Sequence, residues 1–440
     1  MINKKYSRYN LDMPVDGKIL LYNSVTDNFL LLENLLFELL TAARNENYIV
    51  GIHDYHPDFY KELCDKGFII DEDFNEYLSV RDKIISTDNG TEEFNIIINP
   101  TMNCNFKCWY CYEEHIKGSK MTKSTIDKVF ALIHNVIVRD RVKSLYLGWF
   151  GGEPLLYYEQ VMLPILKYAS EICEQNNVIF ESDITTNGFL LRPEMLPIFK
   201  KYNLNFFQIT LDGNRDKHNK VRFVNEKRGS YDEIIQNIKL LTLNNFIVNL
   251  RINFTDDTLK GLEEIIYDLK DCDSEFLTID MHQVWQTKND NDRIHNKEFE
   301  NKIKEIKDEF RESDLKVASN DVSYITNSCY ADKHNEVVVN YNGDIYKCTA
   351  RDFTKENSLG YIDTDGNLIW NQQKYDKRQS AKLNNKPCQE CPILPICGSG
   401  CSEYAYNYDG EDYCVYNFDI NKKKELVLDH FYESLQKNAV

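Results

Sequence analysis

Short apolar runs alternate with amphipathic segments through the middle of the chain. The strand-like runs cover residues 94–98, 144–150, 178–186, 205–211, 247–254 and 276–284. Between them, apolar residues recur at helical spacing over Lys123–Val138, Tyr158–Glu174, Arg192–Lys201 and Tyr231–Asn244. This alternation indicates repeated βα units and a parallel sheet. Six repeats are too few for an eight-stranded barrel, so we predict an α/β fold with an open, partial (β/α)6 barrel of TIM type over residues 91–315.

The first 90 residues follow a different pattern. Strand-like segments at 18–24 and 28–33 flank a short turn, and helical patterns at 35–43 and 58–66 precede a short strand at 68–71. This order resembles the small winged-helix domain with which enzymes that modify ribosomal peptides hold the leader of their substrate. We therefore expect residues 1–90 to bind a leader as an extra strand on an exposed sheet edge. A structural cap on the barrel is the alternative, and a DNA-reading winged helix is disfavoured because acidic residues are at least as frequent there as basic ones.

Composition narrows the class of protein. The chain has 440 residues, 42% of them apolar, which is enough for two or three domains with cores of their own. Its 52 Lys+Arg and 70 Asp+Glu give a net charge of −18, which disfavours nucleic acid as a partner. The sequence contains no apolar stretch long enough for a membrane span and no secretory signal, so we expect a cytoplasmic protein without a membrane partner.

Cysteine placement carries most of the chemical information. Thirteen cysteines in a chain expected in a reducing compartment do not indicate a disulfide framework. Cys64, Cys173 and Cys272 are isolated and are expected to be small buried apolar residues. The other ten fall into a set of three near residue 100 and a set of seven after residue 328.

The first set is a C-x3-C-x2-C run of Cys104, Cys108 and Cys111 that follows the first predicted barrel strand. Three thiolates on one short loop can hold three irons of a cubane cluster and leave the fourth iron free for a ligand that is not protein. A zinc site completed by His115 is the alternative that the spacing leaves open. The aromatic residue before the last cysteine, Tyr110, favours the cluster.

With that aromatic residue, the run resembles the C-x3-C-x-aromatic-C signature of the radical S-adenosylmethionine (AdoMet) superfamily. The resemblance implies that Cys104, Cys108 and Cys111 hold a [4Fe–4S] cluster whose free iron chelates AdoMet. One electron from this cluster would then cleave AdoMet to a 5′-deoxyadenosyl radical. Tyr110 would lie against the adenine.

Further segments resemble the same superfamily at the expected distances. Gly151-Gly152-Glu153-Pro154 resembles the segment whose backbone and carboxylate take the AdoMet ammonium, and a charge-assisted hydrogen bond suits that role. The segment 184–188, which ends in Asn187-Gly188, resembles the strand end that touches the ribose. The stretch with Asp212, His218 and Arg222 resembles an LDG…HD…R pattern, and Arg222 would meet the AdoMet carboxylate as a guanidinium fork. Asn219 stands where the superfamily more often has Asp, and Arg251 is a candidate second polar contact.

The C-terminal set spans 86 residues. Cys329 is followed by Gly343 and Cys348, and then by Cys388-x2-Cys391-x5-Cys397-x3-Cys401 and Cys414. Spacing alone fits a zinc ribbon or an iron–sulfur site. The complete pattern resembles the SPASM extension, so we predict a SPASM domain over residues 316–440 with two auxiliary [4Fe–4S] clusters. The resemblance assigns the inner cluster to Cys329, Cys348 and Cys401, and the outer cluster to Cys388, Cys391, Cys397 and Cys414.

These features together predict a radical AdoMet peptide maturase with three [4Fe–4S] clusters. It would install an intrapeptide crosslink in a leader-bearing precursor peptide, with a thioether favoured over a carbon–carbon link, and take electrons from a flavodoxin or ferredoxin. Seven thiolates leave one auxiliary iron open, unless Cys272 supplies an eighth ligand. One alternative is an anaerobic sulfatase-maturing enzyme that makes formylglycine, but Thr349 stands where such enzymes carry a catalytic Asp. A non-catalytic iron–sulfur or zinc regulator is the alternative from another class.

Overall fold

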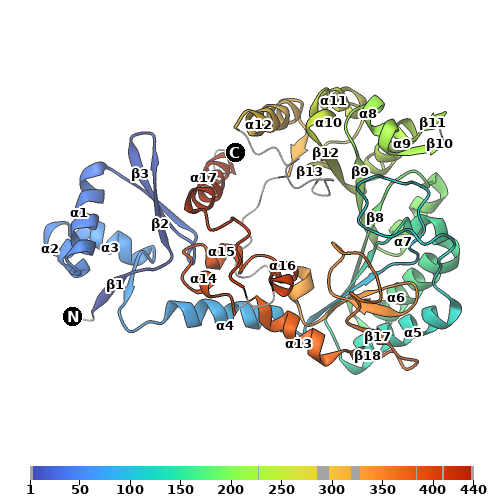
Figure 1. Cartoon of the computed structure of the whole chain (residues 1–440), viewed down its shortest axis with the longest axis horizontal. Helices are drawn as coiled ribbons and strands as arrows, with labels where there is room; N and C mark the ends of the chain where they lie inside the picture. Colours follow the sequence, from blue (N-terminus) through green and yellow to red (C-terminus); the bar gives the residue numbers. More distant parts are fainter. Residues whose placement is uncertain are drawn as a thin grey trace. The chain divides into compact units, whose positions relative to one another are not determined.

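The computed structural model describes residues 3–225, 227–284, 297–318, 328–382, 384–408 and 411–437 (Figure 1). The chain divides into two compact units. The first comprises residues 1–90, 320–334 and 372–440, and the second comprises residues 91–319 and 335–371. The C-terminal segment expected to form one iron–sulfur domain therefore contributes to both units. In the described ranges, no helix has the length and apolarity of a membrane span.

A long mixed sheet forms the centre of the second unit. In the described residues its strand order is β14-β13-β12-β9-β8-β7-β6-β15-β16-β17-β18. All neighbours from β14 to β15 are parallel, and β15 to β18 are antiparallel. The strands are β6 (Glu93–Ile98), β7 (Ser144–Trp149), β8 (Ile179–Thr186), β9 (Leu204–Leu211), β12 (Ile247–Phe254), β13 (Leu277–Gln283), β14 (Lys316–Val317), β15 (Glu336–Val339), β16 (Asp344–Tyr346), β17 (Gly360–Ile362) and β18 (Leu368–Trp370). A short antiparallel pair lies outside this sheet and consists of β10 (Phe223–Asn225) and β11 (Arg228–Gly229).

Helices join the parallel strands of this sheet, as Figure 1 shows. They are α5 (Lys123–His134), α6 (Leu163–Asn176), α7 (Leu196–Lys201), α8 (Arg215–Val221), α9 (Tyr231–Thr242), α10 (Asp256–Leu259), α11 (Glu264–Leu269) and α12 (Lys297–Glu312). A π-helical turn extends α5 over Asn135–Arg139, and another precedes α6 over Tyr158–Met162. The apolar faces of these helices and strands share one large core.

The two faces of each strand differ in polarity, as the period of two requires. In β12, Val248, Leu250 and Ile252 are fully buried in that core. The alternate positions Asn249 and Asn253 point to the other, inner face of the sheet and are only partly buried. The carboxyl ends of the parallel strands lie along one edge of the sheet, and α/β barrels carry their active sites at that end.

The six strands and the helices predicted from the sequence are all present, and each predicted strand end lies within one residue of the observed one. The partial barrel is therefore confirmed. The extension of its sheet by β15–β18 was not predicted, because those strands are short and one of them, β15, pairs with β6, more than 230 residues earlier in the sequence.

The first unit contains a three-stranded antiparallel sheet in the order β2-β3-β4. Its strands are β2 (Asn10–Val15), β3 (Lys18–Asn23) and β4 (Asn28–Leu32), and a separate pair is formed by β1 (Lys4–Tyr6) and β5 (Ile69–Asp71). The helices are α1 (Asn34–Asn45), α2 (Ile52–Tyr55), α3 (Pro57–Asp65), α4 (Glu76–Asp88), α13 (Gln372–Ala381), α14 (Lys386–Gln389), α15 (Leu394–Cys397), α16 (Ser402–Asn407) and α17 (Ile420–Lys437). Strand β2 and helix α4 lie outside the elements predicted from the sequence.

In the first unit, residues 1–90 and the C-terminal segment contribute to the same hydrophobic clusters. Met13 and Leu20 of the three-stranded sheet pack in one cluster with Ile393, Ile396 and Val427. A second cluster joins Tyr9, Val80 and Ile84 to Leu394. Residues 1–90 are thus packed onto the C-terminal cysteine segment, and deleting them would expose a core.

Candidate active site

The cysteine loop follows β6 and contains three free cysteines, of which Cys104 and Cys108 are partly buried and Cys111 is exposed. Burial raises the pKa of Cys104 and of Cys111 to about 12, and it also raises the pKa of Cys108. Thiols in such surroundings stay protonated unless a cation binds them, because the thiolate is the metal ligand. This donor set therefore suits a metal centre rather than a nucleophile.

An unpaired donor next to these thiols supports that assignment. The Asn187 side-chain amide donates to Asn105 Oδ1 at 2.8 Å and lies 4.0 Å from the Cys104 sulfur. The buried Nδ2 of Asn105 has no hydrogen-bond partner among the described residues. Because buried donors are nearly always paired, an acceptor supplied by a cluster or by AdoMet fits this position.

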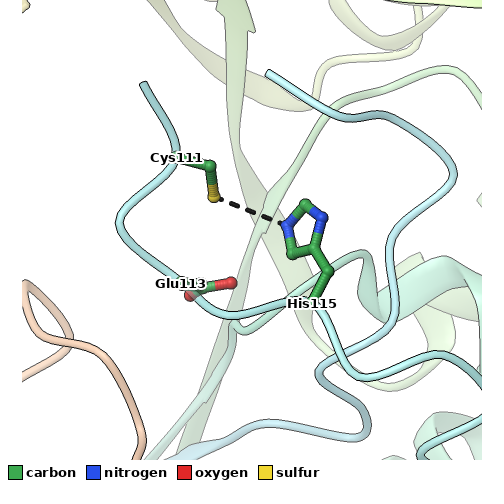
Figure 2. Close-up of side chains that lie close together, drawn as sticks. All are labelled: Cys111, Glu113 and His115. Carbon is green, nitrogen blue, oxygen red and sulfur yellow. Dashed lines mark hydrogen bonds between the residues drawn. The ribbon is translucent and has the colours of Figure 1, made fainter. Parts of the chain in front are cut away.

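A second group of ligand-type side chains lies at the end of the loop. Figure 2 shows that Cys111 and His115 point toward one another, with Glu113 beside them. Their ligand atoms lie within 4.8 Å of one another, and 3.5 Å separates the Cys111 sulfur from His115 Nε2. The geometry therefore keeps His115 available for the alternative zinc site.

Tyr110 is the centre of a hydrogen-bond network. Its hydroxyl donates to Asp212 Oδ1 and accepts from Arg222 Nη2 at 2.8 Å and from Asn253 Nδ2 at 3.0 Å. Arg222 Nε donates to Asp212 Oδ2 at 2.5 Å, and both side chains of that ion pair are buried. Burial raises the pKa of Tyr110, so its hydroxyl keeps the proton that it donates. Three of the predicted residues thus come together, and Asn253 joins them.

The Gly-Gly pair lies against the cysteine loop in a backbone conformation that favours glycine. Gly151 and Gly152 have φ of 77° and 52°. A Cβ at Gly152 would lie 2.3 Å from the Asn103 carbonyl oxygen, so no larger residue fits there. The Gly152 N–H donates to Glu113 Oε2 at 2.7 Å, and burial raises the pKa of Glu113 to about 7.

Glu153 is fully buried and satisfied by its own chain. Oε1 accepts from the Leu155 N–H at 3.0 Å and from the Thr186 hydroxyl at 2.8 Å. Oε2 accepts from the Asn187 N–H at 2.8 Å. Burial raises the pKa of Glu153, and these three donors oppose the shift. The Glu153 carboxylate, which the sequence assigned to the AdoMet ammonium, thus links its own turn to the end of β8 by hydrogen bonds. These contacts favour a structural role for Glu153.

Other residues singled out in the sequence have local partners. Arg251 donates from Nε to Asn253 Oδ1 at 3.1 Å, so it is linked to the Tyr110 network through Asn253 rather than through Tyr110 itself. His218 accepts from the Asp212 N–H at 3.2 Å. Asn219 accepts from the Ser230 and Tyr231 N–H groups at the start of α9, which gives this residue a structural task where the pattern has Asp.

Sequence reasoning missed Asn105, Glu113 and Asn253. Glu113 follows Cys111 by two residues, and a carboxylate that close to a cysteine run was the available signal. Asn253 alternates with buried apolar residues in β12, which indicates the inner face but not its partner.

Four C-terminal cysteines gather around one pocket of the first unit. Cys388, Cys391, Cys397 and Cys414 line it together with Tyr413, Tyr416 and Lys423. Asn385 Nδ2 donates to the Cys388 sulfur at 2.8 Å, and Lys423 Nζ donates to the Cys391 sulfur at 3.4 Å. Such donors stabilise thiolate charge, so this set has the surroundings expected of metal ligands.

The remaining cysteines are divided between the units. Cys329 and Cys401 belong to the first unit, and Cys348 follows β16 in the second. Cys173 is fully buried, as expected, whereas Cys64 and Cys272 are partly buried and pack against apolar clusters. Burial raises the pKa of Cys272 to about 11, and its hydrogen bond with Thr242 opposes the shift. These surroundings favour a packing role over that of an eighth ligand.

Comparisons with known proteins agree with the site. Residues 98–269 match the radical SAM superfamily, and residues 329–392 match the SPASM iron–sulfur cluster-binding domain. The chain is thus a radical SAM enzyme with a SPASM domain, and this class binds iron–sulfur clusters and AdoMet.

Two curated relatives and two solved structures refine the comparison. The cysteine-type anaerobic sulfatase-maturating enzyme of Clostridium novyi is 25% identical over 70% of this chain and 88% of its own length. The radical SAM cyclopropyl synthase TigE of Paramaledivibacter caminithermalis is 23% identical over 58% of this chain and 57% of its own. Streptococcus suis SuiB bound to its precursor peptide SuiA superposes with a TM-score of 0.53 at 15% identity, covering 93% of this chain and 98% of SuiB. The structure of anSMEcpe with bound AdoMet and Cp18Cys peptide superposes with a TM-score of 0.57 at 16% identity, covering 79% of this chain and 100% of anSMEcpe. At these identities the structural likeness concerns the fold.

Proposed function

We propose that this enzyme is a peptide maturase that installs an intrapeptide crosslink, a thioether in preference to a carbon–carbon link, in a ribosomally made precursor. The observation that carries the proposal is the three-stranded sheet with its helices in the first unit, on the same chain as a radical SAM domain. The similarity to TigE, and to SuiB with its precursor peptide, supports a peptide substrate. Thirteen cysteines fit a reducing cytoplasm.

We assign three [4Fe–4S] clusters to the two cysteine sets, of three and of seven cysteines, that were predicted from the sequence. Cys104, Cys108 and Cys111 would hold the radical cluster, and the C-terminal seven would hold two auxiliary clusters, supplied with electrons by a flavodoxin or ferredoxin. When bound, the radical cluster and AdoMet would supply the chemistry of hydrogen-atom abstraction from the substrate.

The chain's own residues would orient AdoMet through three features. Arg222 donates a hydrogen bond from Nε to Asp212 and another from Nη2 to the Tyr110 hydroxyl. Nη1 is therefore the nitrogen that would bind the AdoMet carboxylate. Asn253 and Asp212 form hydrogen bonds with the Tyr110 hydroxyl, and these would hold the ring against the adenine. The turn at Gly151 and Gly152 would offer backbone carbonyl oxygens, which can accept hydrogen bonds from the ammonium.

The leader would bind to β4. Within the described residues β4 is an edge of its sheet, with β3 on one side and no strand on the other. Leu31 on this strand and Leu35 just after it are 44% and 78% exposed. An extended peptide could thus add main-chain hydrogen bonds along β4 and place apolar side chains on these two residues.

The proposal is tested by co-producing the enzyme anaerobically with each short peptide encoded beside its gene. Mass spectrometry should find a product that lacks one pair of hydrogens and resists thiol alkylation at one cysteine. Leu31→Asp should weaken leader binding and crosslinking, while AdoMet cleavage with dithionite continues. Unchanged leader affinity in this variant would refute docking on β4. Truncation at residue 91 is unsuitable because it removes part of a shared core.

The alternative is a sulfatase-maturing enzyme, and the C. novyi relative favours it. Such an enzyme would convert a cysteine in a sulfatase-derived peptide to formylglycine, which aldehyde-reactive probes detect. Formylglycine formation without any crosslinked product would reverse the assignment.

A further inference from the structure

A histidine and an aspartate lie together on the inner face of β13. His282 and Asp280 alternate along this strand with Ile279 and Leu277, which are fully buried in the core of the second unit. Their side chains therefore point to the opposite face. In the parallel register, Asp280 pairs with Arg251 and His282 pairs with Asn253.

This register places the pair next to the AdoMet site. Asn253 donates to the Tyr110 hydroxyl at 3.0 Å, and paired residues of adjacent strands lie about 5 Å apart. His282 is thus one strand beyond a residue that contacts the cysteine loop. It lies at the carboxyl end of its strand, where reacting groups of such sheets are found.

The contacts give the two side chains different tasks. His282 Nε2 lies 2.7 Å from Asp280 Oδ2, and Asn249 Nδ2 donates to the same oxygen at 3.5 Å. Burial raises the pKa of Asp280, but His282, Asn249 and Arg251 outweigh burial and hold it below its usual range. The carboxylate therefore stays charged and fixes the imidazole with its proton on Nε2.

The other ring nitrogen is left free for chemistry. No described residue forms a hydrogen bond with His282 Nδ1, and the side chain is 41% exposed. A neutral imidazole with Nε2–H on a carboxylate has a basic lone pair on Nδ1, and the carboxylate stabilises the imidazolium that forms when a proton arrives.

We propose that His282, oriented by Asp280, is the general base that takes the proton of the substrate nucleophile during crosslinking. This inference rests on the proposed function. In a thioether-forming turnover, the acceptor C–H bond loses its hydrogen atom to the adenosyl carbon, and the cysteine S–H bond loses its proton to Nδ1. The C–S bond forms, and one electron passes to an oxidised iron–sulfur cluster. Atoms and electrons then balance.

The test separates hydrogen abstraction from proton removal. The probe is the cysteine peptide crosslinked in the co-production experiment, synthesised with perdeuterated side chains. Deuterium in 5′-deoxyadenosine reports abstraction, and the mass of the peptide reports crosslinking. His282→Gln keeps a donor for Asp280 but has no basic nitrogen, and His134→Gln, on an exposed position of α5, is the matched control.

In His282→Gln, crosslinked product per labelled 5′-deoxyadenosine should fall roughly a hundredfold, while deuterium transfer continues. Asp280→Asn should show a smaller loss of the same kind, and added imidazole should restore crosslinking to His282→Ala. A wild-type ratio of product to labelled 5′-deoxyadenosine in His282→Gln would overturn the inference. If the wild-type enzyme transfers no deuterium from any peptide encoded beside its gene, the proposed function fails and this inference with it.

Discussion

Replacing Glu153 by Gln distinguishes two roles of this carboxylate. If Glu153 binds AdoMet, the substitution should lower AdoMet affinity, whereas if Glu153 stabilises its own turn, the substitution should lower the stability of the protein. Glu153→Gln preserves the shape of the side chain. Its amide retains one oxygen, whereas the carboxylate accepts three donors on two oxygens. In the better orientation the oxygen stays with Leu155 and Thr186, and the new NH2 group faces the Asn187 N–H.

The magnitude follows from these contacts. One buried N–H left without an acceptor costs about 1–3 kcal/mol, and two charge-assisted hydrogen bonds become neutral at about 1 kcal/mol each. Removing a fully buried charge returns part of this cost, since burial opposes ionisation of Glu153. We therefore expect a net loss of about 2–4 kcal/mol in the stability of the second unit.

Amide hydrogen exchange shows where in the protein the stability is lost. In reduced, anaerobic protein, the Asn187 amide should exchange faster in Glu153→Gln, and the urea midpoint of the second unit should fall. Glu159→Gln is the matched control, since Glu159 is exposed and paired with Arg192 at 3.2 Å, a contact worth less than about 1 kcal/mol. AdoMet affinity is measured on the same samples. Unchanged stability and exchange with weakened AdoMet binding would refute the structural role and restore Glu153 as a ligand contact.

Three further predictions concern the same unit. Alanine at Cys104, Cys108 and Cys111 should remove about four irons per chain and abolish AdoMet cleavage, and iron analysis after anaerobic reconstitution checks this; a chain that purifies with zinc and no iron would contradict it. Arg222→Lys cannot keep both the Asp212 and Tyr110 contacts, so equilibrium dialysis should show AdoMet binding weakened about tenfold or more. Burial raises the pKa of Asp183 from 3.8 to about 6, so the stability linked to its neutral form is present below about pH 4 and lost as pH rises through 6. Asp183→Asn should therefore stabilise the protein by about 2–3 kcal/mol near pH 8 and hardly at all near pH 4. If the urea midpoint of the variant exceeds that of the wild type by the same amount at both pH values, the prediction is wrong.

Local patterns were sufficient for the barrel and for the cysteine sets. Strand and helix periods depend on neighbouring residues, so the six strands were predictable within one residue at each end. The spacing of Cys104, Cys108 and Cys111 is equally local, because one loop carries all three thiols. The spacing alone left a zinc site open, and the class of chemistry was predicted from the resemblance of this run to the radical AdoMet signature.

Tertiary structure alone decided which partners these residues have. Tyr110, Asp212, Arg222 and Asn253 come from segments up to 143 residues apart, and only strand pairing brings them together. The Gly151–Pro154 motif identifies Glu153, but it does not show that the Glu153 carboxylate already accepts three hydrogen bonds from its own chain. The packing of residues 1–90 onto the C-terminal segment is likewise a long-range contact between apolar surfaces. The local sequence of either surface does not show which other segment packs against it. Period and spacing are properties of adjacent residues, whereas burial and hydrogen-bond partners depend on the whole folded chain.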